Sequence, residues 1–515
     1  MVEAKAPPAS LLPPLQRGTM RQLIGAALAI PLLLAAMASR AEWLEAQTPH
    51  MTVYSDGTAR QLREAAARLE DYDGLLRAVT RTPPTADTDR LAVYLVRSSS
   101  DLVTAGGPNR RDVAGFYAAR LGGIAAVALR GNTGRLTGEE TVQHEYAHHF
   151  MMRYFPAYYP PWYVEGFAEY LMTARFTPER IEVGLASAER IERLINHHWL
   201  PLDTVLTANP SQLADDQRLA FYAESWLFVH YLLESEARAA MLAGYLDALG
   251  KGTPEAVAFQ TAFAMAPATM QRELFSYVNG RMHYGVMNRL PRYSPDSVAI
   301  RQLPDAADDL LLPRLALMLS YQGKPAPLAE TLAAVRKAAA RHSGDPFAQR
   351  VLARAEIEAG DRDAGAALAE ALLATAPDDT ELLFLRGLAD FNAGGADPQA
   401  WAARSASARG WFARAVKADS NNYTAHYFLA ITLPDSHDAA LIELLTARSL
   451  APQVAAIALT AAGKLINKQR QAEARTLLQP IAADPHGGPA AERARKMIEG
   501  MTAKASDGGA KPVAE

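Results

Sequence analysis

The chain has 515 residues, of which 49% are hydrophobic and 21% are charged, and its formal net charge is -4. This length predicts more than one domain, and the small net charge gives no reason to expect nucleic-acid binding. The sequence contains no cysteine. Disulfides and thiolate ligands are therefore excluded, so a metal ion must be held by histidine and carboxylate side chains.

The N-terminal segment is predicted to direct export. Arg17 and Arg21 precede an apolar run from Leu23 to Ala38, and small residues follow the run. This layout is typical of a secretory signal peptide, and the run is shorter than the roughly 20 residues that a membrane span needs. We expect residues 1–41 to be a signal peptide or, if they are retained, an N-terminal anchor. The protein is then periplasmic or extracellular.

Residues 42–290 combine strand patterns with helix patterns. Strands are predicted at 51–54, 91–96, 113–117 and 124–129, with a polar loop at 98–109. Helices are predicted at 58–79, 138–154, 162–174, 179–195, 215–233, 237–249 and 254–263. A small mixed sheet that is followed by helices favours an α+β domain with a helical lobe.

The helix predicted at 138–154 carries the motif His144-Glu145-Tyr146-Ala147-His148. Residues four apart lie on one face of a helix, so both imidazoles can reach one metal ion, and Glu145 can reach a water molecule beside it. Catalytic zinc usually has three protein ligands. Glu165 is the candidate for the third, because the sixteen residues before it allow a loop and an antiparallel return helix.

The stretches HEYAHHF (144–150) and PWYVEGFAEY (161–170) resemble the gluzincin group of zinc metallopeptidases. They resemble in particular the peptidase-MA-like bacterial family, some of whose members carry tetratricopeptide repeats. The likeness extends over roughly residues 42–240 and includes a downstream helix at 222–232. It implies a zincin-like metallopeptidase domain at 42–290.

The resemblance also implies the composition of the metal site. His144, His148 and Glu165 would bind Zn²⁺, and a water molecule would complete the coordination. Glu145 would act as the general base. Isolated matches to this motif do occur by chance, so two ordinary surface histidines are the simpler alternative.

Three further residues receive roles from the same resemblance. Glu169, one turn beyond Glu165, would accept a hydrogen bond from a ligand histidine, although a solvated surface charge is the alternative. Tyr222 is the first choice and His230 the second for a donor to the oxyanion, and neither follows from spacing. The strand at 124–129 is expected to be an edge strand that pairs with an extended substrate.

From about Leu311 the sequence consists of Ala- and Leu-rich helical hairpins. Ala353 and Gly387 are small residues 34 apart, a period that resembles tetratricopeptide repeats. Later units are irregular, so an irregular helical domain is the alternative. We expect residues 300–500 to form an all-α tetratricopeptide-like solenoid and residues 501–515 to be a disordered tail.

Together these patterns predict an exported zinc metallopeptidase that hydrolyses peptide bonds in a peptide or protein substrate. The repeats would bind the substrate or a protein partner, with no nucleic acid involved and with membrane contact only through a retained N-terminal segment. Two alternatives stay open. One is a repeat-based interaction protein with an inactive peptidase-like domain, and the other is a zinc hydrolase that acts on a non-peptide amide.

Overall fold

The computed structural model describes residues 43–83, 90–111, 113–131, 138–288, 290–320, 325–393, 398–434 and 438–507. The predicted signal peptide or anchor at 1–41 lies outside these ranges. Among the helices that are described, none has the length and apolar character needed to cross a membrane.

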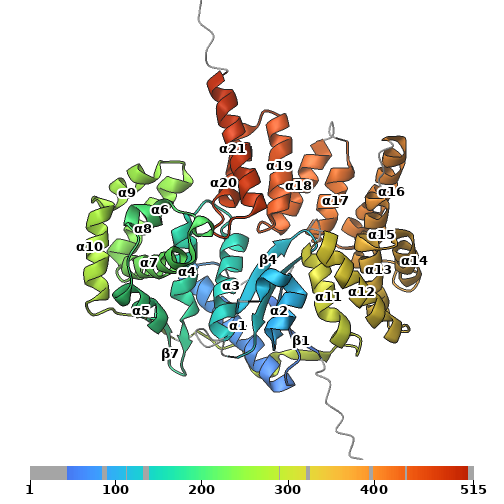
Figure 1. The fold of residues 1–515 in the computed structure, drawn as a ribbon, viewed down its shortest axis with the longest axis horizontal. Coiled ribbons are helices and arrows are strands. Elements are labelled where there is room, and N and C mark those ends of the chain that lie inside the picture. The colour runs from blue at the N-terminus through green and yellow to red at the C-terminus, as the bar shows by residue number, and fades with distance from the viewer. Residues whose placement is uncertain are drawn as a thin grey trace, which may run out of the picture. The chain divides into compact units, whose positions relative to one another are not determined.

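The chain contains both strands and helices up to residue 302, with the run of helices α5–α10 between β7 and β8, and is helical after it (Figure 1). The strands are β1 Leu44–Gln47, β2 Met51–Ser55, β3 Leu91–Val96, β4 Gly115–Arg120, β5 Gly123–Leu129, β6 Arg175–Phe176, β7 Arg180–Val183, β8 Gly285–Asn288 and β9 Ala299–Gln302. The helices up to that point are α1 Ala59–Thr80, α2 Ser99–Gly106, α3 Gly138–Tyr154, α4 Pro161–Met172, α5 Ala188–Asn196, α6 Leu202–Thr207, α7 Asp215–Leu233, α8 Glu236–Gly250, α9 Glu255–Phe263 and α10 Pro267–Val278. The later helices are α11 Ala307–Ser320, α12 Pro325–Arg341, α13 Pro346–Ala359, α14 Arg362–Leu373, α15 Thr380–Asn392, α16 Pro398–Ala418, α17 Tyr423–Thr432, α18 Asp438–Leu450, α19 Ala455–Asn467, α20 Gln471–Ala482 and α21 Pro489–Asp507.

A six-stranded mixed sheet has the order β4-β5-β3-β2-β1-β9. Strands β2, β3 and β5 are parallel, and the other three strands pair antiparallel to their neighbours. Because side chains alternate along a strand, Val93 and Ala126 lie in one core with α1 and α3, whereas Tyr94 and Val127 lie in another with α2 and α11. The sheet is therefore covered by helices on both faces.

The expectation that the strand at 124–129 has a free edge is wrong. Strand β5 lies between β3 and β4, so the outer position belongs to β4. Both strands are apolar and adjacent in sequence, and only the parallel pairing of β5 with β3 decides which of them lies at the edge. Any substrate pairing at this edge would involve β4.

Other predicted elements also change. The loop predicted at 98–109 contains α2, which begins at a capping box formed by Ser98 and Asp101. The single helix predicted at 179–195 is strand β7 followed by α5. Between them Gly184 has a φ of +73°, a backbone conformation that glycine adopts without strain.

The boundary between the two regions differs from the one predicted at 290–300. Strand β9 pairs with β1 and so completes the sheet from beyond residue 290. Helix α11, which the sequence pattern assigns to the solenoid, packs on the sheet through Leu311 and Leu315. The sheet and the first helix of the helical region therefore share one hydrophobic core.

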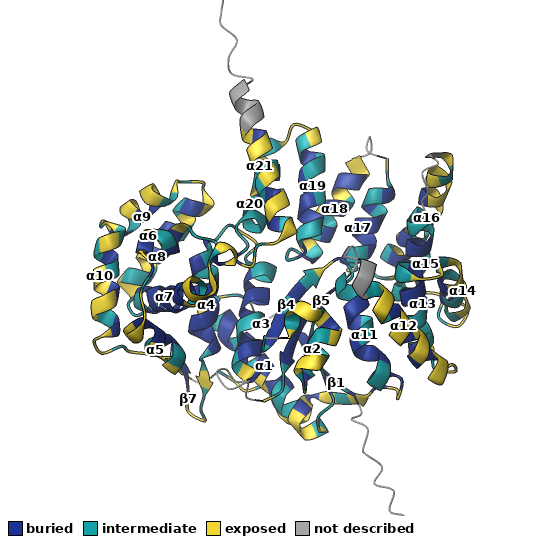
Figure 2. Ribbon diagram, in the orientation of Figure 1, coloured by how far each residue is buried: buried dark blue, intermediate teal, exposed yellow. Residues whose placement is uncertain are grey.

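The region from α11 onwards is helical, and each helix packs on the next. Helices α13 and α15 begin at Pro346 and Thr380, which matches the 34-residue period. The period then breaks, because α16 is 21 residues long and α17 begins only at Tyr423. Figure 2 shows that these helices bury one face each and leave the other exposed. Helix α21 continues to Asp507, which corrects the first part of the disordered tail predicted at 501–515; residues 508–515 lie outside the described ranges.

Candidate metal centre

Helices α3 and α4 form the frame of the candidate centre. Glu139 and Glu140 lie in the first turn of α3, where carboxylates interact favourably with the positive end of the helix dipole. Pro161 occupies the first turn of α4, where its missing N–H costs no helical hydrogen bond. The two helices pack against each other, and this brings Glu165 opposite the two histidines of α3.

The donor atoms of His144, His148 and Glu165 converge. The Nε2 atoms of the two histidines are 3.0 Å apart. Oε2 of Glu165 lies 3.5 Å from Nε2 of His144 and 3.4 Å from Nε2 of His148. Ligands about 2.0 Å from a tetrahedral zinc ion are about 3.3 Å from one another. The three residues thus fit zinc without any rearrangement of the backbone.

The charges of this cluster also favour a cation. The side chain of Glu165 is 0% exposed, yet both its carboxylate oxygens and Nδ1 of His148 have no hydrogen-bond partner among the described residues. Burial alone would raise the pKa of Glu165, but the His148 and His144 imidazoles hold it well below its usual range. A buried carboxylate without hydrogen bonds is costly unless it is paired or bound to a metal.

His144 shows the same preference for positive charge. Burial alone would lower the pKa of His144, but the surrounding carboxylates, led by Glu165 and Glu169, raise it to about 9. The cluster therefore attracts a proton to this imidazole. A divalent cation that binds the same nitrogen would replace that proton.

Glu145 lies beside the cluster on α3 and is half-buried. Its negative charge acts on Arg110, whose pKa is lowered by burial and partly restored by Glu145. Arg110 comes from the short helical turn after α2 and packs its guanidinium 4.6 Å from the centre of the Phe116 ring. No motif in the sequence indicates Arg110, because it follows directly on a segment that is predicted to be a loop.

Glu169 lies on the Nδ1 side of His144, as the prediction requires, but the atoms are 3.8 Å apart. This distance exceeds that of a hydrogen bond. The Glu169 carboxylate is instead held by Arg190 of α5, which donates from Nε at 2.8 Å and from Nη2 at 2.6 Å. The sequence does not indicate Arg190, because it lies in a helix whose beginning is misplaced by the local pattern.

The two candidates for the oxyanion donor have different surroundings. Burial raises the pKa of Tyr222, and the negative charges of Glu165 and Glu169 raise it further, so this tyrosine lies close to the cluster and remains protonated. His230 is buried elsewhere in the lobe: its Nδ1 is 2.8 Å from the Tyr277 hydroxyl and its Nε2 is 2.9 Å from the Gly184 carbonyl oxygen. With both nitrogens engaged, His230 is a structural residue.

A buried polar network connects α1 to α3. His50 Nδ1 lies 2.7 Å from Glu70 and 3.2 Å from Asp73, and Asp73 also pairs with Arg77 at 2.6 Å. Asp73 accepts a hydrogen bond at 2.8 Å from the hydroxyl of Tyr146, which lies between the two histidines of the motif. These charges compensate one another within the protein, so the network acts as a clamp between α1 and α3.

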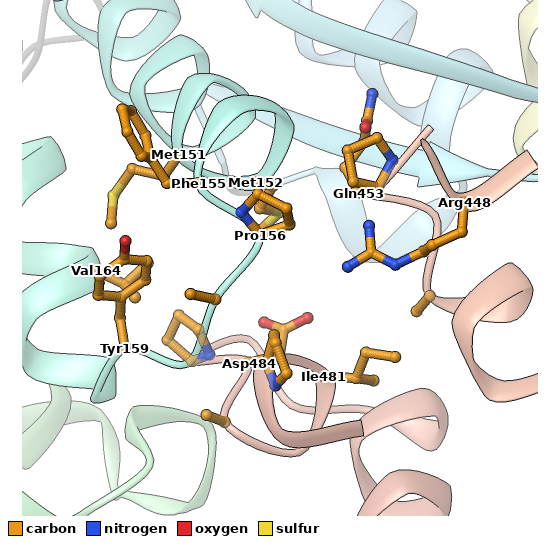
Figure 3. Close-up of a pocket in the computed structure, with 16 residues that line it drawn as sticks. Met151, Met152, Phe155, Pro156, Tyr159, Val164, Arg448, Gln453, Ile481 and Asp484 are labelled. Atoms are coloured by element: carbon orange, nitrogen blue, oxygen red, sulfur yellow. The ribbon is translucent and has the colours of Figure 1, made fainter. Parts of the chain in front are cut away.

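A pocket lies next to the centre, between α3–α4 and helices α18–α20 (Figure 3). One wall is apolar and is formed by residues such as Met151, Phe155 and Tyr159. On the opposite wall Nε of Arg448 and Oε1 of Gln453 are buried and lack hydrogen-bond partners within the described ranges, and burial lowers the pKa of Arg448 to about 10. The C-terminal helices thus contribute buried polar groups to a pocket beside the helix that carries the histidine motif.

A third residue that the sequence does not indicate is His486, on the loop between α20 and α21. Its Nε2 lies 3.7 Å from Oε1 of Glu165. The only available signal is the loop-forming composition of Asp-Pro-His-Gly-Gly at 484–488. That composition predicts a turn and gives no information on what the turn contacts.

No family model matches the chain, and no curated protein matches it. One similar solved structure is a thermophilic TPR protein from Thermus thermophilus, which is 18% identical in sequence. The match covers 39% of this chain and 97% of that chain, with a TM-score of 0.30. Another is MamA from Desulfovibrio magneticus RS-1, which is 15% identical. The match covers 39% of this chain and 98% of that chain, with a TM-score of 0.25. TM-scores this low do not establish a shared fold, and the function proposed below rests on the chain's own residues.

Proposed function

We propose that this protein is a zinc-dependent hydrolase that cleaves peptide bonds and is exported through residues 1–41. The observation that supports it most is the cluster of His144, His148 and Glu165, whose donor atoms have the separations of a tetrahedral zinc site. A zinc ion held there supplies a Lewis acid for the scissile carbonyl and makes water a nucleophile near neutral pH.

The chain's own side chains supply the remaining chemistry. Glu145 adjoins the cluster, where its carboxylate takes the proton of the attacking water and passes it to the leaving amine. Tyr222 donates its hydroxyl hydrogen to the developing oxyanion, and its raised pKa keeps that hydrogen in place. The half-buried Arg110 lies within electrostatic reach of Glu145, whose negative charge acts to raise the pKa of Arg110.

The decisive experiment compares the intact protein with Glu145→Gln. Zinc content is measured by elemental analysis, and hydrolysis is measured with fluorescein-labelled casein and a library of quenched fluorogenic peptides. Loss of a general base lowers rates by roughly 10²- to 10⁴-fold, whereas zinc binding should be retained, because Glu145 is not one of the ligands.

A matched control is Glu139→Gln, on the first turn of the same helix, where Glu139 pairs with Arg68 at the surface. This variant should keep full activity. Hydrolysis by Glu145→Gln at the rate of the intact protein would exclude the mechanism. Hydrolysis of peptides that does not depend on zinc would exclude the proposed function.

A second candidate is an interaction protein that binds partners through its helical region. The observation that favours it is a pair of exposed apolar side chains on α18, Ile442 and Leu445, which lie one turn apart. If the purified protein binds no stoichiometric zinc at neutral pH, this candidate is the better one. The same assay therefore separates the two functions.

A further inference from the structure

A loop from the far end of the chain closes one side of the metal centre. The ring of His486 lies edge-on to the ring of His148, with centroids 5.4 Å apart and planes at 88°. Its Nε2 is 3.7 Å from Glu165 Oε1. The helical region therefore contributes a side chain to a centre whose three candidate ligands come from α3 and α4.

The geometry places His486 outside the set of direct ligands. The donor atoms of His144, His148 and Glu165 lie within 4.8 Å of one another, and His486 does not belong to this group. Oε2 is the Glu165 oxygen that approaches both other ligands. His486 approaches Oε1, the second oxygen of the same carboxylate, which lacks a hydrogen-bond partner among the described residues.

The loop that carries His486 is anchored to the metallopeptidase-like region. Nδ2 of Asn209 donates to the Asp484 carbonyl oxygen at 2.7 Å, and the Asp484 carboxylate accepts from the backbone N–H of His486 at 2.9 Å. Gly487 has a φ of +64° and lies so close to Ser211 that an added Cβ would overlap the serine hydroxyl. The position of His486 is thus determined by contacts on both sides of it.

We propose that His486 is a positioning residue of the metal centre, whose Nε2, 3.7 Å from Oε1 of Glu165 in this structure, donates a hydrogen bond to that oxygen when a metal ion is bound. This inference rests on the proposed zinc site. Side chains that hydrogen-bond to metal ligands orient them, and their loss typically weakens metal binding by about 10- to 100-fold. With Oε1 engaged by His486, Glu165 would bind the metal through Oε2, the oxygen that lies near both histidines. The centre is then complete only when the C-terminal loop is docked.

The test measures zinc affinity of the full-length protein by competition with a chromophoric chelator, without reference to activity. His486→Ala should bind zinc about 10- to 100-fold more weakly, and the visible spectrum of its cobalt-substituted form should shift. His486→Gln, which keeps an N–H donor, should recover part of the affinity. His197→Ala removes a histidine that is 44% exposed and lies 3.6 Å from the carboxylate of Glu192, and should change neither the zinc affinity nor the cobalt spectrum.

A second variant tests the position of the loop and keeps the imidazole. Gly487→Ala strains the backbone and displaces Ser211, so it should lower zinc affinity in the same direction as His486→Ala. Because the loop is exposed at His486, neither variant is expected to prevent folding, which circular dichroism checks.

The possible outcomes separate this inference from the proposed function. Zinc affinity and a cobalt spectrum of His486→Ala within about twofold of the intact protein, well short of the expected loss, would overturn the inference, even if hydrolysis fell. A protein that binds zinc, loses affinity in His486→Ala and cleaves no peptide would overturn the proposed function and support the inference. An intact protein that binds no zinc would overturn both.

Discussion

At the scale of single residues, the absence of a side chain at Gly166 determines how deeply Glu165 is buried. Helix α4 crosses α7 at this glycine so closely that an added Cβ would overlap the Ser225 carbonyl oxygen. The close approach buries Glu165 completely. Full burial removes water from the carboxylate and leaves it dependent on the histidines or on a metal ion.

Gly166→Ala should therefore destabilise the protein by about 1–3 kcal/mol, the usual cost of overpacking, and should also weaken zinc binding by moving Glu165. Urea unfolding of the zinc-free protein and chelator competition measure the two effects. Gly244→Ala is the control, because Gly244 lies in the interior of α8 with no atom within 4 Å of an added Cβ. The control should gain up to about 1 kcal/mol from helix propensity, and an equal loss in both variants would contradict the packing argument.

At the scale of elements, helix α7 provides the back wall of the centre and carries a second buried carboxyl group. Glu224 is 3% exposed and accepts a hydrogen bond at 2.7 Å from the backbone N–H of Leu200. Burial raises the pKa of Glu224 to about 8, although this hydrogen bond and the charge of Arg193 act in the opposite direction. The folded state thus holds a proton on Glu224 that the unfolded chain releases near pH ~4.3.

This difference makes stability depend on pH. The stabilisation from protonated Glu224 is complete below about pH 4 and is lost as pH rises towards 8, because the unfolded state ionises first. Glu224→Gln cannot ionise and keeps an oxygen acceptor for Leu200. Its free energy of unfolding relative to the natural chain should rise between about pH 5 and 8 by up to about 1.4 kcal/mol per pH unit. Urea titrations at several pH values check this, and a difference independent of pH would contradict it.

The helices and strands also differ in how well the local sequence pattern predicts their boundaries. The predicted boundaries of α7, 215–233, agree with the structure because these nineteen residues form a long run without glycine or proline that begins with Asp215 and Asp216 in the first turn. Strand β7 has four residues, too few for a period, and the sequence pattern merges it with α5. Strands β1 and β9 are missed for the same reason, and their pairing joins residues more than 250 positions apart.

At the scale of the whole molecule, the hairpin between β4 and β5 joins the sheet to the helical region. The Tyr423 hydroxyl donates to the Arg120 carbonyl oxygen at 3.1 Å, and the Thr424 hydroxyl donates to that of Leu121 at 2.7 Å. On the other side, a Cβ added to Gly122 would overlap the Met318 carbonyl oxygen of α11. The hairpin tip is thus held between α11 and α17.

Gly122→Ala should loosen this junction and cost about 1–3 kcal/mol of stability. Thermal unfolding followed by calorimetry should show a lower midpoint or a split transition, and limited proteolysis should cut more readily near the junction. Gly463→Ala in α19 is the control, because an added Cβ there has no neighbour within 4 Å. A Gly122→Ala protein as stable as the control variant would show that the hairpin tip tolerates displacement.

Local spacing of residues is enough to locate the helix that carries His144 and His148, the return helix with Glu165 and the helical region after them, because the helical period is a local property. Tertiary packing was needed to establish that β4 forms the edge of the sheet, that α11 belongs to the core of the sheet, and that Arg190 holds Glu169. Packing also brought His486 to Glu165 from the opposite end of the chain. Such contacts depend on how helices and strands pack, which no local pattern of residues encodes.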